Sequence, residues 1–375
     1  MNALEYAVPL VGYSAPSRQT NRAISDHVRG LLACLGFQVE EWTYRDEAGV
    51  EKVSLVAKRG TGTGGFAYFC HTDTVPADRW TGPGGNPNVG VVADGRLYGR
   101  GSCDMRGSLA AMLAAVEQIP QSELRGPVYV VCTADEEIGS GGAKQIAQQS
   151  PLFAEMAAHQ TPGVIGEPTM LDVVHAHKGI CGFRAVSRGR AAHSSLRTGL
   201  NANLAMIPFL QEMKVIYDEI ERDPAWQHPA FDPPTLSWNI GINDHQPAIN
   251  ITAERSVCTV SFRPMPGQNV QPLFDRAEAA AKYYGLEWTV LWQGSPLYVD
   301  PQSEFVQAML QLADRSSSRT VSYGTDGVML TALKQLIVCG PGDIAQAHTV
   351  DEWISLDQLE RGTALYARMI RHWCG

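Results

Sequence analysis

Short apolar segments alternate with helical stretches through the first 170 residues, and this alternation constrains the fold more than any other feature of the sequence. Four apolar segments are bounded by Gly, Pro or polar residues, as buried strands are: residues 54–58, 66–70, 128–134 and 163–167. Residues 17–35 and 108–118 carry apolar side chains at helical spacing, and each stretch opens with a serine, a favoured N-cap. The alternation predicts an α/β layer with a mostly parallel sheet.

The pattern changes near residue 180 and returns near residue 294. Between these points the predicted order is strand, helix, strand, strand, helix, strand, at residues 180–188, 201–220, 235–242, 256–262, 270–284 and 287–292. This order is typical of a ferredoxin-like α+β unit. The first pattern then resumes with a helix at 303–315, a strand at 336–339 and a helix from residue 356. We therefore expect an α/β domain of residues 1–179 and 294–375, interrupted by a smaller domain of residues 180–293.

Composition narrows the classes of function. The net charge is −9 and no basic run occurs, so we expect neither nucleic acid nor an anionic membrane as a partner. No apolar stretch approaches the ~18 residues of a membrane span, and the first residues lack the basic start and apolar core of a secretory signal. The eight cysteines include no Cys-x-x-Cys pair. We expect reduced, buried thiols in a cytoplasmic protein.

Acidic and imidazole side chains follow several of the predicted strands. They are His71, the pair Glu136 and Glu137, Glu167 and His348. Open α/β sheets bind their ligands beyond the carboxyl ends of the strands, which is where these side chains are expected. Any one of them alone is more simply an ordinary polar residue, but their convergence on one sheet edge predicts a metal site. The run Gly60–Gly65 matches Gly-x-Gly-x-x-Gly, but a strand follows it, so it is interpreted as a turn.

Asp104 precedes the predicted helix at 108–118. It could cap that helix, or its carboxylate could bridge two cations. Two histidines and several carboxylates, without cysteine, suit zinc or a similar divalent ion in a catalytic site. A metal pair needs about five or six ligands, which is the number found here.

In these residues the chain resembles the M20 family of dizinc amidohydrolases and peptidases. The resemblance rests on residues 71–76, 97–107, 135–137, 166–168, 192–195 and 340–348, in order along nearly the whole chain. Within the family, His-Thr-Asp-Thr-Val-Pro at 71–76, His-Lys-Gly at 177–179 and the segment 340–352 are most similar to acetylornithine deacetylases.

The resemblance implies a role for each residue of the metal site. His71 and Glu167 would hold one zinc ion, Glu137 and His348 a second, and Asp104 would bridge the two, with cobalt as a plausible substitute for zinc. Glu136 would be the general base. Asp73 would orient His71, as the outer partner of a ligating imidazole does.

The resemblance also implies roles for the inserted domain, which would be a lid and a dimerisation domain. His193 would act in the site of the partner subunit of a homodimer joined through residues 180–293. Asn250 and Arg263 would bind the carboxylate side of the substrate. Lys178, Gly324 and Thr325 would contribute further substrate contacts. Alone, Arg263 would more simply be a surface ion-pair residue and His193 a polar residue at a strand end.

The implied activity is hydrolysis of the amide of an N-acyl amino acid, N2-acetylornithine first, in arginine biosynthesis. The same machinery would serve a succinyl-diaminopimelate desuccinylase, an aminoacylase or a dipeptidase. Two segments depart from the deacetylase pattern: Tyr323–Gly327 leans toward the desuccinylases, and Trp80–Asn88 replaces the usual stretch near the site. A metal-binding protein without catalysis is disfavoured because Glu136 is present.

Overall fold

The computed structural model describes residues 1–245 and 248–375, which divide into two compact units. Unit 1 contains residues 1–176, 297–319 and 325–375, and unit 2 contains residues 177–296 and 320–324. Residues 320–324, which the sequence placed in the larger domain, group with unit 2, where the Ser322 hydroxyl donates to the carbonyl of Asp232 at 2.6 Å. Among the described residues, no helix combines the length and the apolar character needed to cross a membrane.

Unit 1 is built on a mixed sheet with the strand order β1-β2-β6-β3-β7-β15-β8-β13, and β14 also pairs with β8. Its strands are β1 Gln38–Arg45, β2 Glu51–Arg59, β3 Phe66–His71, β6 Val128–Thr133, β7 Gly163–Ile165, β8 Val174–His177, β13 Leu297–Tyr298, β14 Arg319–Val321 and β15 Leu336–Val338. The central strands β6, β3, β7 and β15 are parallel, as predicted. Antiparallel pairs, including the β1–β2 hairpin, flank them. Strand β1 was not predicted because all its side chains are exposed or half-buried and it has no apolar run.

The remaining elements of unit 1 cover or extend this sheet. The helices are α1 Ala3–Val11, α2 Arg22–Cys34, α3 Gly107–Glu117, α4 Gly141–Gln149, α5 Pro151–Ala158, α8 Glu304–Ala313 and α9 Leu356–Cys374. A small antiparallel sheet has the order β16-β5-β4, with β4 Val91–Ala93, β5 Arg96–Tyr98 and β16 Trp353–Ser355. Short helical turns are η1 Ser102–Arg106, η2 Gln121–Glu123, η3 Glu136–Ile138, η5 Asp326–Val328 and η6 Ile344–Gln346. The run Gly60–Gly65 connects β2 to β3 without a helix, which confirms its interpretation as a turn.

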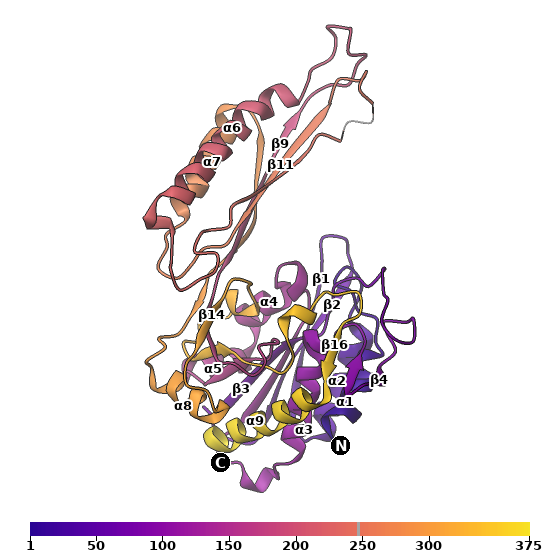
Figure 1. The fold of residues 1–375 in the computed structure, drawn as a ribbon, viewed down its shortest axis with the longest axis vertical. Coiled ribbons are helices and arrows are strands. Elements are labelled where there is room, and N and C mark those ends of the chain that lie inside the picture. The colour runs from indigo at the N-terminus through magenta and orange to yellow at the C-terminus, as the bar shows by residue number, and fades with distance from the viewer. Residues whose placement is uncertain (246–247) are drawn as a thin grey trace. The chain divides into compact units, whose positions relative to one another are not determined.

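Helix α3 lies against α1, α9 and β3, and all its residues except the last are buried (Figure 1). A helix that is apolar all round is expected in such a position. Ser108 does not cap it, because the helix already begins at Gly107. Instead the Ser108 hydroxyl lies 2.8 Å from the hydroxyls of Tyr68 and Tyr366, and so joins β3, α3 and α9.

The predicted cap Ser17 is also wrong, because α2 begins only at Arg22. The hydroxyl of Ser17 donates to the carboxylate of Asp73 at 2.6 Å. The intervening residues are fixed by Asn21, whose side chain exchanges hydrogen bonds with the main chain of Val53. Ser17 therefore makes a tertiary contact with Asp73 and does not cap α2.

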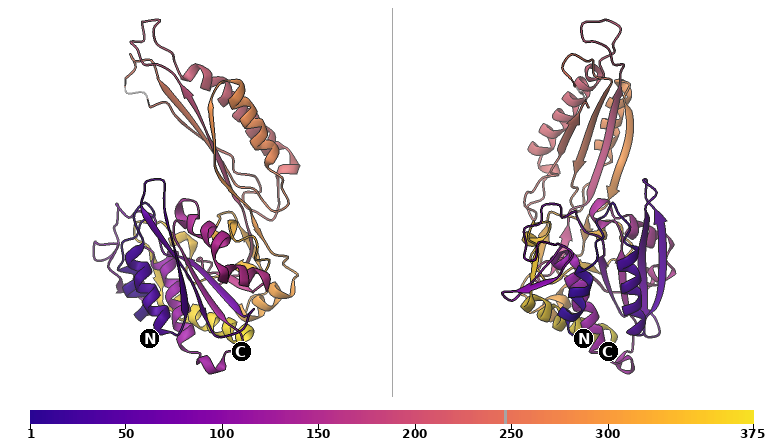
Figure 2. Two further views of the ribbon diagram at one scale, coloured as in Figure 1. Left: turned by 180° about the vertical axis from the view of Figure 1, so that it is seen from behind. Right: turned by 90° about the vertical axis from the view of Figure 1, so that its right-hand side faces the viewer.

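Unit 2 is a four-stranded antiparallel sheet, within the described residues, with the order β10-β11-β9-β12. The elements follow the chain as β9 Ile180–Arg188, α6 Asn203–Arg222, η4 Pro224–Trp226, β10 Asn239–Asn243, β11 Arg255–Phe262, α7 Gln271–Tyr283 and β12 Glu287–Gly294. Helices α6 and α7 lie side by side on one face of this sheet (Figures 1 and 2). Between the two helices and the sheet lies a layer of aromatic side chains: Phe183, Phe209, Trp238, Phe262 and Phe274.

Strand β10 begins four residues later than the predicted strand at 235–242, at Asn239. At the predicted start, the carbonyl of Thr235 accepts a hydrogen bond from the buried ammonium of Lys178 at 2.7 Å. The next residue, Leu236, still accepts the main-chain N–H of Arg263 at 2.6 Å, so contact with the chain of β11 persists before β10 begins.

Candidate functional site

Three neighbouring parallel strands bring their carboxyl ends together in unit 1. His71 ends β3 and is in register with Thr133 at the end of β6, from which the chain enters the turn that carries Glu136 and Glu137. Strand β7 lies on the other side of β3, and Glu167 follows it. The sheet topology thus places these predicted residues at one edge, as parallel strands require.

Asp104 reaches the same edge from η1, at the entry to α3. Its side chain is only 8% exposed, and its backbone torsions, φ −118° and ψ 94°, are not helical. No side chain caps the first turn of α3, so the alternative role of Asp104 as a helix cap is wrong.

The two histidines approach opposite oxygens of Asp104. Nε2 of His71 lies 3.0 Å from Oδ1, and Nε2 of His348 lies 3.2 Å from Oδ2. On the outer side of each histidine stands a glutamate: Oε1 of Glu167 is 3.7 Å from Nε2 of His71, and Oε2 of Glu137 is 3.0 Å from Nε2 of His348. The five side chains therefore form two groups that share Asp104.

Glu136 belongs to the same cluster. Ligand atoms of His71, Glu136 and Glu167 lie within 4.8 Å of one another, and the same holds for His71, Asp104 and Glu137. By distance alone, Glu136 could be a metal ligand as well as a base. We call His71, Asp104, Glu136, Glu137, Glu167 and His348 the ligand cluster.

The carboxylates of the ligand cluster repel one another in a buried setting. Burial raises the pKa of Glu136 well above its usual range, and the charges of Glu167, Asp326 and Glu137 raise it further, against the effect of His71. Burial and the charge of Asp104 likewise raise the pKa of Glu167. Crowded carboxylates of this kind gain from a divalent cation, and oxygen and imidazole donors suit zinc and similar ions. The residues present therefore fit a metal centre.

The histidines respond to the same charges. Burial lowers the pKa of His71, but the hydrogen bond to Asp104 and the surrounding carboxylates outweigh it and raise that pKa well above its ordinary value. Hydrogen bonds to Asp104 and Glu137 raise the pKa of His348 to about 10. The two histidines in turn hold the pKa of Asp104 below its usual range in spite of burial.

Asp73 is at the cluster, but its contacts differ from the predicted ones. Nδ1 of His71 lies 3.0 Å from the main-chain carbonyl of Asp73 and 3.7 Å from its carboxylate oxygen Oδ1. The carbonyl is therefore the nearer partner, and it fixes the ring as a carboxylate would. The carboxylate of Asp73 instead accepts the Ser17 hydroxyl at 2.6 Å and the main-chain N–H of Glu136 at 3.3 Å.

Sequence reasoning missed the groups behind the cluster. Tyr44 and Lys52 face each other across the β1–β2 hairpin and bind the two carboxylate oxygens of Asp135, each at 2.7 Å. Asp135 precedes Glu136 and adopts a left-handed conformation, with φ 59°. No sequence signal pointed to Tyr44 or Lys52, because the hairpin itself was not predicted.

Asp326 was missed although it follows the predicted residue Thr325. It is buried and accepts a hydrogen bond from the hydroxyl of Thr133, at the end of β6. Burial is the main cause that raises its pKa to about 6. Thr325 itself caps η5, since its hydroxyl accepts the N–H of Gly327 at 3.1 Å. Gly324 belongs to unit 2.

The predicted substrate residues of unit 2 fall at two ends of its sheet. The N–H of Ser194 donates to the carbonyl of Asn250 at 2.9 Å, so exposed His193 and exposed Asn250 stand on adjacent loops. Lys178 and Arg263 lie beyond the other end of β11 and β9. At about 3.3 Å per residue, the eight residues of β11 separate Asn250 from Arg263 by about 25 Å. Within one chain the predicted pair is not brought together.

The side chain of Lys178 binds main-chain carbonyl groups. Its ammonium donates to the carbonyls of Pro233 and Thr235, both at 2.7 Å. Burial and the nearby charge of Arg263 lower its pKa to about 8. A half-buried Arg263 is the more open cation at this end of the sheet.

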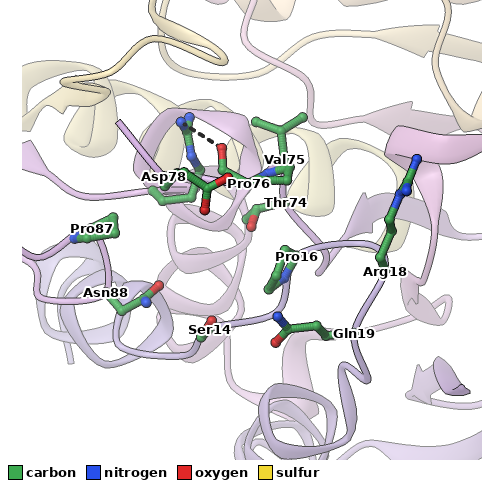
Figure 3. A pocket seen from close by; sticks show the side chains of 12 residues that line it. Ser14, Pro16, Arg18, Gln19, Thr74, Val75, Pro76, Asp78, Pro87 and Asn88 are labelled. Carbon is green, nitrogen blue, oxygen red and sulfur yellow. Dashed lines mark hydrogen bonds between the residues drawn. The ribbon is translucent and has the colours of Figure 1, made fainter. Parts of the chain in front are cut away.

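Two pockets adjoin the loop that follows Asp73. One has a volume of about 360 Å³, and Figure 3 shows Thr74, Val75 and Pro76 between a wall of residues 14–19 and a wall containing Pro87 and Asn88. The other, of about 250 Å³, is lined by His348, Trp80 and residues 76–79. Since the side chain of His348 is 53% exposed, this second pocket gives solvent access to the ligand cluster.

Comparison with known proteins agrees with this geometry. The model of the family described as "Peptidase family M20/M25/M40" matches residues 67–372. An acetylornithine deacetylase from Myxococcus xanthus is 33% identical, over 98% of this chain and 96% of the relative. An acetylornithine deacetylase from Proteus mirabilis (strain HI4320) is 32% identical, over 96% and 92%.

Solved structures show the same fold at lower identity. An M20 family metallo-carboxypeptidase from Sulfolobus solfataricus has a TM-score of 0.76 at 16% identity, over 100% of this chain and 99% of that chain. Human carnosine dipeptidase 1 has a TM-score of 0.73 at 17% identity, over 99% and 96%.

Proposed function

The chain belongs to the peptidase family M20/M25/M40, and on that premise we propose that it is a zinc-dependent deacylase of N-acyl amino acids, with N2-acetylornithine as the first substrate to test. One observation carries the proposal: Asp104 stands between His71 and His348, with a glutamate beside each histidine. The two acetylornithine deacetylases that resemble the chain at 32–33% identity support the choice of substrate.

In this proposal the ligand cluster holds two zinc ions, or cobalt in their place. His71 and Glu167 would hold one ion, Glu137 and His348 would hold the other, and Asp104 would serve both. When bound, such ions lower the pKa of a coordinated water to about 7 and polarise the amide carbonyl.

Glu136 is the proposed general base. It takes a proton from the attacking water at a carboxylate oxygen and gives it to the leaving nitrogen, so that an acid and a free amino acid are formed. Burial raises the pKa of Glu136 above its usual range, and a carboxylate with a raised pKa is a stronger base. The N–H···O bond from Glu136 to Asp73 supports a fixed position for the base.

In this proposal unit 2 contributes substrate contacts and the dimer interface. We assign Arg263 to the substrate carboxylate, because a guanidinium offers two parallel donors, and Asn250 and His193 to the same substrate. Asn250 and Arg263 are about 25 Å apart along one chain, whereas an acetylated amino acid is far shorter. Contacts from both residues to one substrate therefore require two chains. Lys178, Gly324 and Thr325 remain secondary candidates.

Apolar side chains on unit 2 support a homodimer. Leu204 and Ile207 on α6 are 68% and 58% exposed, and Ile242 on the edge strand β10 is 62% exposed. An open edge strand beside apolar surface is a favourable place for a second copy. The strand order β10-β11-β9-β12 supports the interpretation of residues 180–293 as a ferredoxin-like lid and dimerisation domain.

The proposed setting is arginine biosynthesis in the cytoplasm. The eight cysteines support a reducing compartment, since none of them is in a disulfide and all but Cys34 are buried. The second candidate activity is that of a desuccinylase, which the run Tyr323–Gly327 favours. Aminoacylase and dipeptidase activities are further outcomes of the same assay.

A panel of N-acyl amino acids tests the proposal. The zinc-loaded protein is incubated with N2-acetylornithine, N-succinyl-diaminopimelate, other acetylated amino acids and dipeptides, and the free amine is measured. We expect fastest turnover of N2-acetylornithine, and about 10²–10⁴-fold slower turnover by Glu136→Gln. Preference for the succinyl substrate would select the second candidate, and no turnover of any amide would refute the hydrolase.

A further inference from the structure

Glu352 is a buried carboxylate that binds the segment carrying Asp104. Its Oε1 accepts the main-chain N–H groups of Cys103 and Asp104 at 2.8 and 2.9 Å. Its Oε2 accepts the N–H of Gly101 and Nη1 of Arg100, both at 2.9 Å. The side chain of Glu352 is 0% exposed, so these four bonds are shielded from water.

The segment needs such a partner because its backbone is irregular. Asp104 and Met105 have non-helical torsions within η1, so the preceding N–H groups do not enter a regular helical ladder. A buried N–H without an acceptor costs about as much as a lost hydrogen bond. One carboxylate satisfies three of these groups, and a charged acceptor forms stronger bonds than a neutral one. Glu352 therefore fixes the path of the chain at Asp104.

The same residue is tied to His348. It lies four positions beyond His348, and directly after it β16 pairs with β5, the strand that leads into the Asp104 segment. The N–H of Gly99 also donates to the main-chain carbonyl of Glu352 at 3.1 Å. Glu352 thus joins the two segments that supply Asp104 and His348.

We infer that Glu352 is a positioning residue, which holds the Asp104 carboxylate between His71 and His348 so that both proposed metal ions can bind. The inference rests on the proposed function for the identity of the ions. The bonds themselves belong to the protein without metal, and this gives the test a readout that does not depend on activity.

The test is Glu352→Gln, examined with and without zinc. Glutamine keeps the length of the side chain, but its amide nitrogen donates, so it opposes the donors either on Cys103 and Asp104 or on Gly101 and Arg100. In metal-free protein, hydrogen exchange of the amides in residues 99–106 should be at least tenfold faster than in wild type. By calorimetric titration, zinc affinity should fall about 10–100-fold, the usual loss when a supporting partner of a ligand is removed.

Glu155→Gln is the matched control. Glu155 accepts bonds from Lys58, at 2.6 Å, and from Tyr129, but it contacts no member of the ligand cluster among the described residues. We expect it to keep wild-type zinc affinity and wild-type exchange in residues 99–106. Glu352→Asp keeps the charge but is one methylene shorter, so its zinc affinity and its exchange rates should lie between those of wild type and Glu352→Gln. If Glu352→Gln does not fold, the same two measurements on Glu352→Asp replace it.

The outcomes separate the inference from the proposed function. A folded Glu352→Gln protein with unchanged zinc affinity and unchanged exchange would overturn the role of Glu352, as would an Asp variant identical to wild type in both measurements. A wild-type protein that binds no divalent ion would instead refute the proposed metal centre, while exchange in the metal-free protein still decides whether Glu352 holds the segment.

Discussion

The main-chain N–H of Glu136 donates to Oδ1 of Asp73 at 3.3 Å. The carbonyl of Asp73 lies 3.0 Å from Nδ1 of His71, so Asp73 links the position of the proposed base to that of a proposed ligand. The resemblance to the M20 family predicted only that Asp73 orients His71. Asp73 therefore helps to position both the proposed base Glu136 and the proposed metal ligand His71.

The first prediction separates Glu136 from Glu137, which are adjacent in sequence and both within reach of the histidines. Glu136→Gln should keep both metal ions and lose about 10²–10⁴-fold in kcat, because a general base is removed. Glu137→Gln should lose affinity for one ion and recover part of its activity at high zinc. Metal content and kcat are measured on both variants. Loss of metal by Glu136→Gln with retention by Glu137→Gln would reverse the assignment.

The second prediction concerns Asp104, whose two oxygens face the two histidines. Asp104→Asn should weaken the binding of both zinc ions, since an amide offers one weakly basic oxygen in place of two charged ones. Elemental analysis after dialysis at low zinc should then show clearly less than one ion per chain. Asp94→Asn changes an exposed aspartate and should keep two. Full metal content in Asp104→Asn would exclude a bridging role.

The third prediction uses the pKa of Asp326, which burial raises from 3.8 to about 6. A carboxyl group whose pKa is higher in the folded protein stabilises the fold at pH below 3.8, and this contribution is lost as the pH rises to 6. At about 1.4 kcal/mol per pH unit, the loss is about 3 kcal/mol. Metal-free Asp326→Asn should therefore be more stable than metal-free wild type at pH 8, with the advantage much reduced at pH 4.5. Equal differences in unfolding free energy at both pH values would contradict the shift.

The fourth prediction tests Arg263 as the carboxylate contact. Arg263→Lys should raise KM at least tenfold and change kcat much less, because lysine cannot form the paired bonds of a guanidinium. Substrates whose α-carboxylate is amidated should be poor for wild type and no worse for the variant. If wild type hydrolyses the free acid and the amide equally well, Arg263 has no such role.

The fifth prediction concerns assembly. His193→Ala should lose about 10²–10³-fold in kcat, the range for one donor to a developing oxyanion. Mixing it with Glu136→Gln should restore some activity, because both defects of the heterodimer then fall in one site and the other site is intact. Sedimentation should show a dimer that Leu204→Lys weakens, through the exposed face of α6. An active monomer, or no restoration between subunits that exchange, would contradict action across a dimer.

Contacts between distant segments lay beyond sequence reasoning, even where one partner, such as Glu352 in the segment 340–352, belongs to a recognised motif. Lys52 and Tyr44 bind Asp135 across 83 and 91 residues of chain, and Glu352 binds the Asp104 segment across about 250. Polar residues in loops and edge strands have no periodicity that marks them as buried. Their partners become visible only when distant segments are packed together.

Local pattern by itself determined the central parallel strands, the main helices and the ligand cluster, because apolar runs of strand length must be buried and parallel strands must end at a common edge. Tertiary structure alone decided what each polar group contacts. Ser17, predicted to cap a helix, donates a hydrogen bond to Asp73. Asn250 and Arg263, predicted to act as a pair, lie at opposite ends of β11. Sequence spacing fixes neighbours only within one element, whereas hydrogen bonds between elements depend on how those elements pack.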